Sequence, residues 1–265
     1  MLTLSPIDLA FGVNLTVLPT INPPPYGDYA QVILDEGIKI VETAGLVKEY
    51  VEKFKAAGCI VLHKCTTIRH SISAIKMGVD FLSIDGFECA GHVGEHDIPN
   101  FVLLNRAREQ LVNPKTGKQV PYIASGGMAN GASLAAALSL GACGINMGTR
   151  FMCTVEAPIH NNIKQSIVDA SEDDTELLMR RWKNTSRLFK NKVTEAAGKI
   201  ERESTTGKFE EIAEYVSGKR GRQVFLNGDK DFGVRYVSIF DTKFCVCEDL
   251  LTARCPNRSG QRVSV

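Results

Sequence analysis

The chain has 265 residues, of which 44% are hydrophobic and 23% charged, a globular composition that excludes a disordered chain. Its 31 Lys and Arg residues nearly balance 30 Asp and Glu residues, so it lacks the basic excess typical of proteins that bind nucleic acid by charge. No apolar run approaches the ~18–20 residues of a membrane-spanning helix, and no signal-peptide pattern is visible. We therefore expect a cytoplasmic protein with neither a nucleic-acid partner nor a membrane span.

Short apolar runs alternate with helical segments through the first 155 residues and predict six strands. The predicted strands are Gly12–Leu18, Ile38–Glu42, Cys59–Lys64, Phe81–Asp85, Pro121–Ala124 and Gly144–Met147. Between them, apolar residues at helical spacing predict amphipathic helices over Leu46–Ala57 and Ile68–Met77. Gly37, Gly58 and Gly78 each close such a helical stretch, which is typical of a left-handed cap before a buried parallel strand.

This alternation, at a pitch of ~20 residues, predicts an α/β fold and favours a TIM-type (β/α)8 barrel over an open sheet. A closed barrel of this type needs eight strands. Because only six are predicted, either the sheet is open or the first two β/α units are missing.

Charge-rich helical stretches follow the last strand and predict an appended helical subdomain. These stretches are Ile159–Ala170, Asp174–Trp182, Val193–Arg202 and Phe209–Val216. We therefore expect a partial barrel over residues 1–157, the helical subdomain over 158–233 and a tail over 234–265. The tail contains Cys245, Cys247 and Cys255, whose spacing does not complete a set of zinc ligands.

A glycine-rich turn follows the fifth predicted strand and precedes a helix predicted over Ala132–Leu140. In the turn Ser125-Gly126-Gly127, glycines allow backbone N–H groups to approach an anion, and a helix N-terminus favours a phosphate. The last two strand ends of a barrel are neighbours, so Gly148 and Thr149 would complete the same phosphate site. The alternative is a tight turn that binds nothing.

Two further strand ends carry residues suited to chemistry. His92, Glu95 and His96 match the H-x-x-E-H zinc-peptidase pattern, but that pattern needs a helix, which the neighbouring glycines disfavour. We therefore predict no metal and interpret His92 as an acid/base or as a hydrogen-bond donor to a ligand, whereas His96 fits a surface histidine better. Lys64 either places its ammonium against a cofactor or leans into solvent.

Five motifs then occur in an order that resembles a known family. They are Gly12-Val-Asn14-Leu-Thr, His63-Lys64-Cys65-Thr, Gly86-Phe-Glu-Cys-Ala-Gly91-His92, Ala124-Ser-Gly-Gly127 and Asn146-Met-Gly148-Thr149-Arg-Phe. Together, from about residue 10 to residue 233, they resemble the nitronate monooxygenase family, formerly called 2-nitropropane dioxygenases. The resemblance implies a (β/α)8 barrel with an added helical domain and FMN as the cofactor, without a metal.

The resemblance also implies roles for individual residues. His92 matches the family's catalytic histidine, which lies near the reactive face of the flavin. The flavin itself would be contacted by Asn14, Lys64 and Gly91. Its phosphate would be held by Ser125, Gly126, Gly127, Gly148 and Thr149.

The exact reaction depends on where this sequence departs from the family. The resemblance implies an FMN-dependent oxidoreductase that oxidises alkyl nitronates with O2. The Phe87-Glu-Cys-Ala-Gly-His92 form, with the prolines at Pro23–Pro25, instead resembles a branch that reduces quinones with NAD(P)H. Because family members begin with about two more β/α units and continue differently after Gly233, a third expectation is a truncated, non-catalytic product with a divergent tail.

Overall fold

The computed structural model describes residues 11–17 and 23–237, which fall into two compact units. The first unit contains the chain up to Asp85 together with Asn100–Ala124 and Ala136–Ile145. The second contains Gly86–Pro99, Ser125–Ala135 and the chain from Asn146 onward. The predicted division at residues 157 and 233 stays a prediction.

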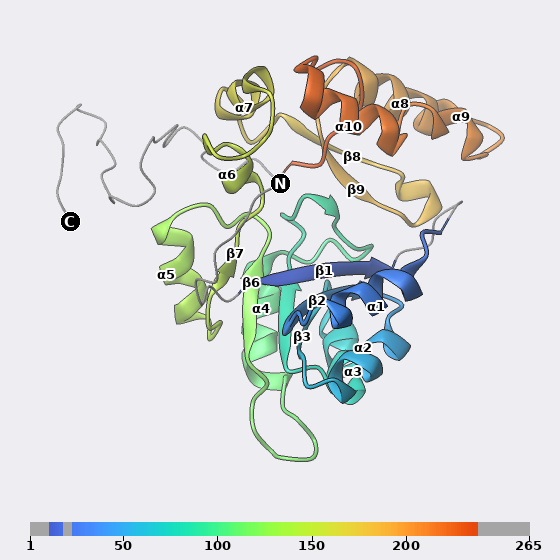
Figure 1. Ribbon diagram of the computed structural model, residues 1–265. Coiled ribbons are helices and arrows are strands. Elements are labelled where there is room, and N and C mark those ends of the chain that lie inside the picture. Colours follow the sequence, from blue (N-terminus) through green and yellow to red (C-terminus); the bar gives the residue numbers. More distant parts are fainter. Residues whose placement is uncertain (1–10, 18–22, 238–265) are drawn as a thin grey trace. The chain divides into compact units, whose positions relative to one another are not determined.

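All six predicted strands are present, and they form one curled parallel sheet that corresponds to part of a barrel wall (Figure 1). The strand order is β1-β2-β3-β4-β6-β7. Their bounds are β1 Gly12–Val17, β2 Ile40–Gly45, β3 Ile60–Cys65, β4 Phe81–Asp85, β6 Tyr122–Ser125 and β7 Ile145–Asn146. Leu18, the last residue of the first predicted strand, lies outside the described residues. The α/β, TIM-type fold class is therefore confirmed.

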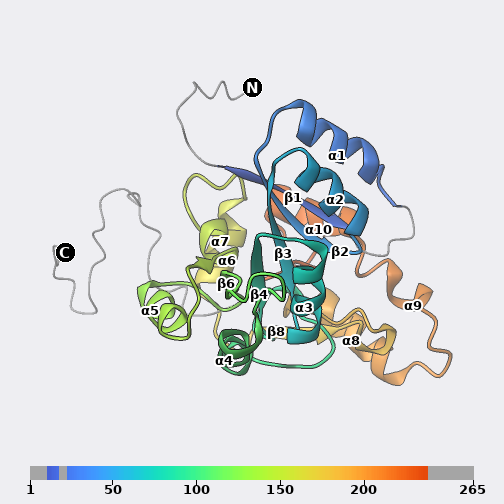
Figure 2. The same ribbon diagram turned by 90° about the horizontal axis from the view of Figure 1, so that it is seen from below.

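Helices connect these strands, as the periodicity predicts. They are α1 Tyr26–Asp35, α2 Lys48–Ala56, α3 Ile68–Met77, α4 Asn100–Gln110 and α5 Gly131–Ser139. Figure 2 shows α1, α2 and α3 ranged along the same side of the strands. Gly37, Gly58 and Gly78 follow three of the helices with φ of 70°, 77° and 93°. This backbone region favours glycine, so the predicted left-handed caps are confirmed.

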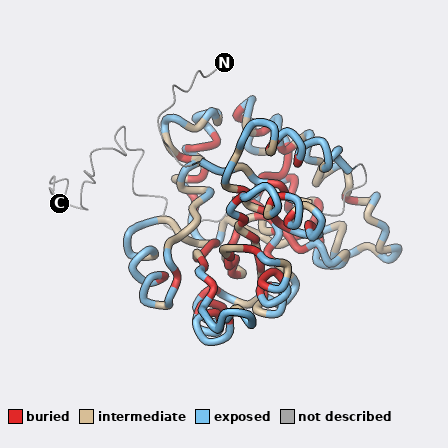
Figure 3. Tube along the Cα trace, turned by 60° about the horizontal axis from the view of Figure 1, so that its bottom comes forward, coloured by how far each residue is buried: buried red, intermediate tan, exposed pale blue. Residues whose placement is uncertain are grey.

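The hydrophobic core of the first unit lies between the sheet and these helices. Val41, Val61 and Leu82 occupy adjacent strands, and each is 0% exposed. Val51 and Phe54 of α2 are also fully buried, so one face of this otherwise polar helix is in the core (Figure 3). Since alternate strand residues face opposite sides, the other face of the sheet is left for polar side chains.

The second unit combines a small antiparallel sheet with helices. Its strands are β5 Gly91–His92, β8 Thr175–Leu178 and β9 Ser186–Phe189, in the order β5-β9-β8. Its helices are α6 Thr149–Met152, α7 Asn161–Val168, α8 Lys192–Glu203, α9 Glu210–Ala213, α10 Gly218–Asn227 and the 3-10 helix η1 Arg180–Trp182. In the described ranges, no helix is both long enough and apolar enough to cross a membrane.

The helix predicted over 174–182 is wrong, because this segment forms β8 and η1 instead. Thr175–Leu178 pairs antiparallel with β9, and the turn between the strands contains the left-handed residues Met179 and Lys183. Leu178 is buried in a cluster with Leu188 of β9, so a distant partner overrides the local helical spacing.

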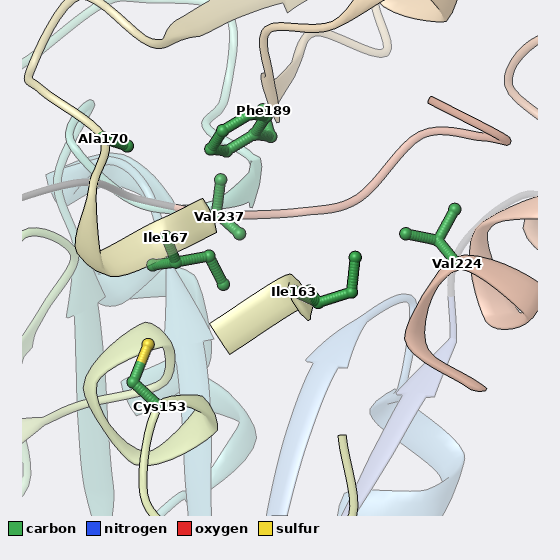
Figure 4. Close-up of a cluster of buried hydrophobic side chains, with 7 residues drawn as sticks. All are labelled: Cys153, Ile163, Ile167, Ala170, Phe189, Val224 and Val237. Atoms are coloured by element: carbon green, nitrogen blue, oxygen red, sulfur yellow. The ribbon is translucent and has the colours of Figure 1, made fainter. Parts of the chain in front are cut away.

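A second buried cluster joins α7 to later parts of the chain. Ile163 and Ile167 lie in this cluster with Phe189, Val224 and Val237 (Figure 4). Thus Val234, Arg235 and Val237 of the predicted tail are buried in the second unit, whereas Tyr236 is exposed. The remainder of the tail, with Cys245, Cys247 and Cys255, lies outside the described residues.

Candidate functional site

Polar side chains share one face of the parallel sheet in the first unit. Asn14 of β1 pairs with Glu42 of β2 in register, so their side chains lie on the same face. Leu62 pairs with Glu42, and Lys64 is two residues further along β3, so it also lies on that face. The register of β4 adds Ser83 and, two residues on, Asp85. We call Asn14, Glu42, Lys64 and Asp85 the polar row.

Direct contacts link the polar row in pairs. The Asn14 Nδ2 donates to Glu42 Oε2 at 2.7 Å. The Lys64 Nζ lies 3.0 Å from Asp85 Oδ2, and the Asp85 side chain is only 2% exposed while that of Lys64 is 37% exposed. The second oxygen of Glu42, Oε1, is buried without a hydrogen-bond partner among the described residues. The row therefore holds a fixed ammonium group and a buried acceptor that a ligand N–H group would satisfy.

His63 precedes Lys64 in sequence but faces the opposite side of the sheet. It is 6% exposed, and its Nδ1 lies 2.8 Å from Thr43 Oγ1. The Thr43 hydroxyl also lies 3.2 Å from the Leu62 carbonyl, and the tautomer of His63 sets which of the two side chains donates to the other. Burial lowers the pKa of His63 to about 4, which keeps the imidazole neutral at pH 7. His63 is therefore a core residue.

In the second unit, the glycine turn after β6 has the conformation that its sequence predicts. Gly126 and Gly127 have φ of 90° and 72°, a backbone region that favours glycine. A Cβ at Gly126 would lie 2.8 Å from the Cys89 backbone nitrogen, so this position has room only for glycine. Ser125 is buried, and its carbonyl accepts from the Gly86 N–H at 3.1 Å.

The start of α5 limits which amides are available to an anion. Asn130 Oδ1 accepts from the Ser133 N–H, and Ser133 Oγ accepts from the N–H groups of Ala129 and Asn130. This reciprocal capping uses amides that a phosphate would otherwise bind. Gly148 is the N-cap of the four-residue helix α6, and Thr149 is its first residue.

His92 lies on β5 and is exposed. Gly91 and His92 pair with Arg187 and Ser186 of β9, and Gly91 has a φ of 68°. The ring of His92 lies 6.1 Å from that of Tyr236, centroid to centroid, with an interplanar angle of 34°. The strand pairing therefore fixes the His92 backbone, and the exposed ring lies beside that of Tyr236.

The helix that the zinc-peptidase pattern needs is absent here, because its first histidine lies in a strand. Glu95 Oε1 accepts from the Thr185 N–H at 2.9 Å, and its Oε2 accepts from the Thr185 hydroxyl at 2.6 Å. Within the described residues, no group of three or more His, Cys, Asp or Glu side chains is placed to hold a metal ion.

Sequence reasoning missed three residues next to those it predicted. Glu42 became visible only from the strand register, which sets it beside Asn14. Tyr236 lies beside Gly91 and His92, although it belongs to a tail with no clear period. Glu95 enters the sequence analysis only as part of the zinc-peptidase pattern. The alternation of β2 places Glu42 on one face of its strand, but no local signal shows which residue of another segment lies opposite any of the three.

The family model described as nitronate monooxygenase matches residues 9–234, which is most of the chain. The chain belongs to the nitronate monooxygenase family. A probable nitronate monooxygenase of Bacillus subtilis is 31% identical over 137 residues, covering 49% of this chain and 38% of that protein. The structure of FabK from Thermotoga maritima superposes with a TM-score of 0.77 at 27% identity, over 89% of this chain and 70% of that one.

A relative whose name gives a different activity also matches the chain. A (3aS,4S,5R,7aS)-5-hydroxy-7a-methyl-1-oxo-octahydro-1H-indene-4-carboxyl-CoA dehydrogenase of Mycobacterium tuberculosis is 28% identical over 189 residues, 71% of this chain and 50% of that protein. The chain thus spans about half the length, or less, of these curated relatives. The nitronate monooxygenase family consists of oxidoreductases, which are in general flavin enzymes that act on small molecules.

Proposed function

We propose that the protein is an FMN-dependent oxidoreductase that oxidises alkyl nitronates with O2. The observation that carries the proposal is the left-handed Gly126-Gly127 turn at the end of β6, where a side chain at Gly126 would clash with the Cys89 backbone. A glycine turn that leads into a helix is typical of a phosphate-binding backbone. Because the α5 cap already uses the amides of Ala129 and Asn130, we assign the phosphate contacts to the amides of Gly127 and Met128. Ser125, Gly148 and Thr149 complete the proposed phosphate-binding set.

The residues of the first unit also suit FMN. The buried Glu42 Oε1 needs a hydrogen-bond donor, and a flavin ring carries an N–H group. Asn14, which donates to the other Glu42 oxygen, is the proposed flavin contact on β1. Lys64 is fixed by Asp85 and supplies a positive charge for the electron-rich part of the ring system. FMN, when bound, supplies the redox chemistry.

His92 is the proposed catalytic residue, next to Gly91 as a further flavin contact. An imidazole is able to donate a hydrogen bond and to change protonation near neutral pH. Its place on β5 fixes the backbone from which the ring projects. We assign to His92 the hydrogen bond that holds the substrate or a charge developing on it.

The charge of the polar row favours a second candidate, reduction of quinones with NAD(P)H. The row holds two carboxylates, Glu42 and Asp85, against the single ammonium of Lys64. A nitronate is an anion and is repelled by this excess of negative charge, whereas a quinone is neutral. The Phe87–His92 loop sequence, which resembles the quinone-reducing branch, points the same way.

Steady-state assays with the two substrate pairs separate these candidates. We expect turnover of alkyl nitronate with O2, and only slow reduction of a quinone by NADH or NADPH. Faster quinone reduction with no nitronate turnover would replace the first candidate by the second. Neither activity in a flavin-loaded sample would defeat both.

The role of His92 is tested with a matched pair of histidine variants. His92→Ala should lower kcat by about 10²–10⁴-fold, which is the usual contribution of a positioned acid/base group, while FMN stays bound. His96→Ala removes an exposed histidine four residues away and should leave kcat unchanged. Equal activity in the two variants would remove His92 from the mechanism.

A further inference from the structure

We propose that Glu95 is a positioning residue, which holds the β5 segment against the β8–β9 hairpin and thereby fixes His92. This inference rests on the proposed function, since it gives Glu95 a role through the proposed catalytic residue. This role differs from the zinc-peptidase interpretation of the H-x-x-E-H pattern, because Glu95 contacts Thr185 and binds neither a metal nor a substrate. All of the contacts involved lie within the second unit.

The carboxylate of Glu95 makes two hydrogen bonds to one buried residue. Thr185 is 1% exposed, and both its N–H group and its hydroxyl donate to Glu95, at 2.9 and 2.6 Å. In return, the Thr185 carbonyl accepts from the Val93 N–H at 3.2 Å. Thr185 directly precedes β9, and Val93 directly follows His92. Glu95 therefore closes the antiparallel pairing at the end nearest His92.

Two more contacts anchor the same loop, one on each side of His92. The Arg187 Nη2 donates to the Phe87 carbonyl at 3.0 Å, and its guanidinium lies 4.8 Å from the centre of the Phe87 ring. The Arg180 guanidinium lies 3.1 Å from an Asp97 carboxylate oxygen. These contacts hold the beginning and the end of the segment, whereas Glu95 holds the part next to the histidine.

Backbone strain is concentrated at this junction. Asp97, Met179 and Lys183 are the non-glycine residues with positive φ in the described ranges, at 50°, 64° and 52°. Asp97 lies in the loop that follows His92. Met179 and Lys183 flank η1, whose Arg180 pairs with Asp97. Such strain persists where surrounding contacts over-determine the backbone, and it is found at sites that must be held in one geometry.

The experiment uses two variants of Glu95 and one control in the full chain. Glu95→Ala removes both acceptors of Thr185. Glu95→Gln retains an acceptor for the Thr185 N–H, and the Thr185 hydroxyl is able to rotate and accept from the glutamine amide. The contact between residues 95 and 185 should therefore be retained. Glu156→Ala removes an exposed carboxylate elsewhere in the same unit and serves as the control.

The first readout, amide hydrogen exchange at Val93, does not depend on flavin or on activity. We expect exchange of the Val93 N–H to accelerate at least tenfold in Glu95→Ala and to stay at the wild-type rate in Glu95→Gln and Glu156→Ala. Unchanged exchange in folded Glu95→Ala would overturn the proposal. If Glu95→Ala does not fold, Thr185→Val takes its place, because this variant loses the shorter of the two hydrogen bonds. Accelerated Val93 exchange in Thr185→Val would support the proposal, and unchanged exchange would overturn it.

The second readout separates positioning from a merely structural effect. Glu95→Ala should lower kcat about tenfold with KM unchanged, because a small misplacement of a catalytic group lowers the rate of the chemical step. In a His92→Ala background, the same change should lower kcat no further, because Glu95 acts through His92. A full tenfold loss in both backgrounds would overturn the proposal. Accelerated exchange of Val93 in Glu95→Ala, together with full activity of His92→Ala, would instead defeat the proposed function. The structural role of Glu95 in holding β5 would then remain supported.

Discussion

His63 and Lys64 are neighbours in the sequence but have opposite environments. The alternation of β3 turns His63 into the core beneath the helices and Lys64 onto the polar row. From the sequence, a lysine at a strand end was equally consistent with a ligand contact and with a solvated side chain. In the structure, the ion pair with buried Asp85 fixes where the Lys64 ammonium lies, so the side chain does not simply extend into solvent.

The burial of His63 predicts a specific loss of stability in acid. Its pKa is about 4 in the folded chain against an ordinary value of 6.5, so between these values the unfolded chain binds more protons. The free energy of unfolding should therefore fall as pH drops from 6.5 to 4, by roughly 3 kcal/mol from this group. Below pH 4 its contribution should be constant.

Urea unfolding as a function of pH measures this effect, with His63→Gln as the comparison. Glutamine does not titrate, yet it retains an N–H donor for the Thr43 hydroxyl. The difference in unfolding free energy between wild type and variant should change by about 3 kcal/mol between pH 6.5 and 4. A pH-independent difference would show that the His63 pKa is not lowered in the folded chain.

The strand positions of Asn14, Lys64 and the glycine turn follow from local sequence, which is why they were predictable. Asn14 lies within the strand β1, Lys64 lies near the end of β3 and the glycine turn follows β6, and each of these strands is marked by its apolar run. Glu42 and Tyr236 were not predictable in this way. Their relevance depends on which residue of another segment lies opposite them, and spacing along the chain carries no such information.

At the scale of elements, the parallel strands were predictable but the antiparallel hairpin was not. A glycine at a helix end followed by an apolar run is a strong local signal, and it recurs before β2, β3 and β4. The β8 and β9 strands are four residues each and gain their stability from pairing and from packing beneath α8. Because their apolar spacing fits a helix equally well, pairing with the partner strand determines that these segments become strands.

The turn between β6 and α5 yields a prediction about flavin binding. Gly127→Leu should abolish FMN retention, because its side chain would occupy the space next to the backbone amides and a φ of 72° is strained for leucine. Gly131→Ala, four residues further on, is the matched control, since a Cβ there meets nothing within 4 Å.

The measurement is the FMN content of each purified variant, determined by absorbance together with its thermal unfolding. We expect the control to keep its FMN and Gly127→Leu to lose it while remaining folded. Strain at one left-handed residue costs about 1–3 kcal/mol, which should lower the Tm without unfolding the chain. Wild-type flavin content in Gly127→Leu would defeat the assignment of the phosphate site.

At the scale of the whole molecule, five ordered motifs predicted the family, and the match over residues 9–234 confirms it. The structure also groups the chain into two compact units whose segments alternate along the sequence. The chain enters and leaves each unit several times, and the loop 86–99 joins residues beyond 146 through contacts such as Glu95–Thr185. Long-range contacts of this kind depend on tertiary packing, which composition and periodicity do not encode.

The proposed function depends most on one property of this chain, the binding of FMN. The direct measurement is the visible absorption spectrum of the purified protein after incubation with excess FMN and removal of the free cofactor, followed by identification of the flavin released on denaturation. We predict a yellow protein that releases FMN at about one equivalent per chain. A folded, colourless protein that retains no flavin would contradict the account.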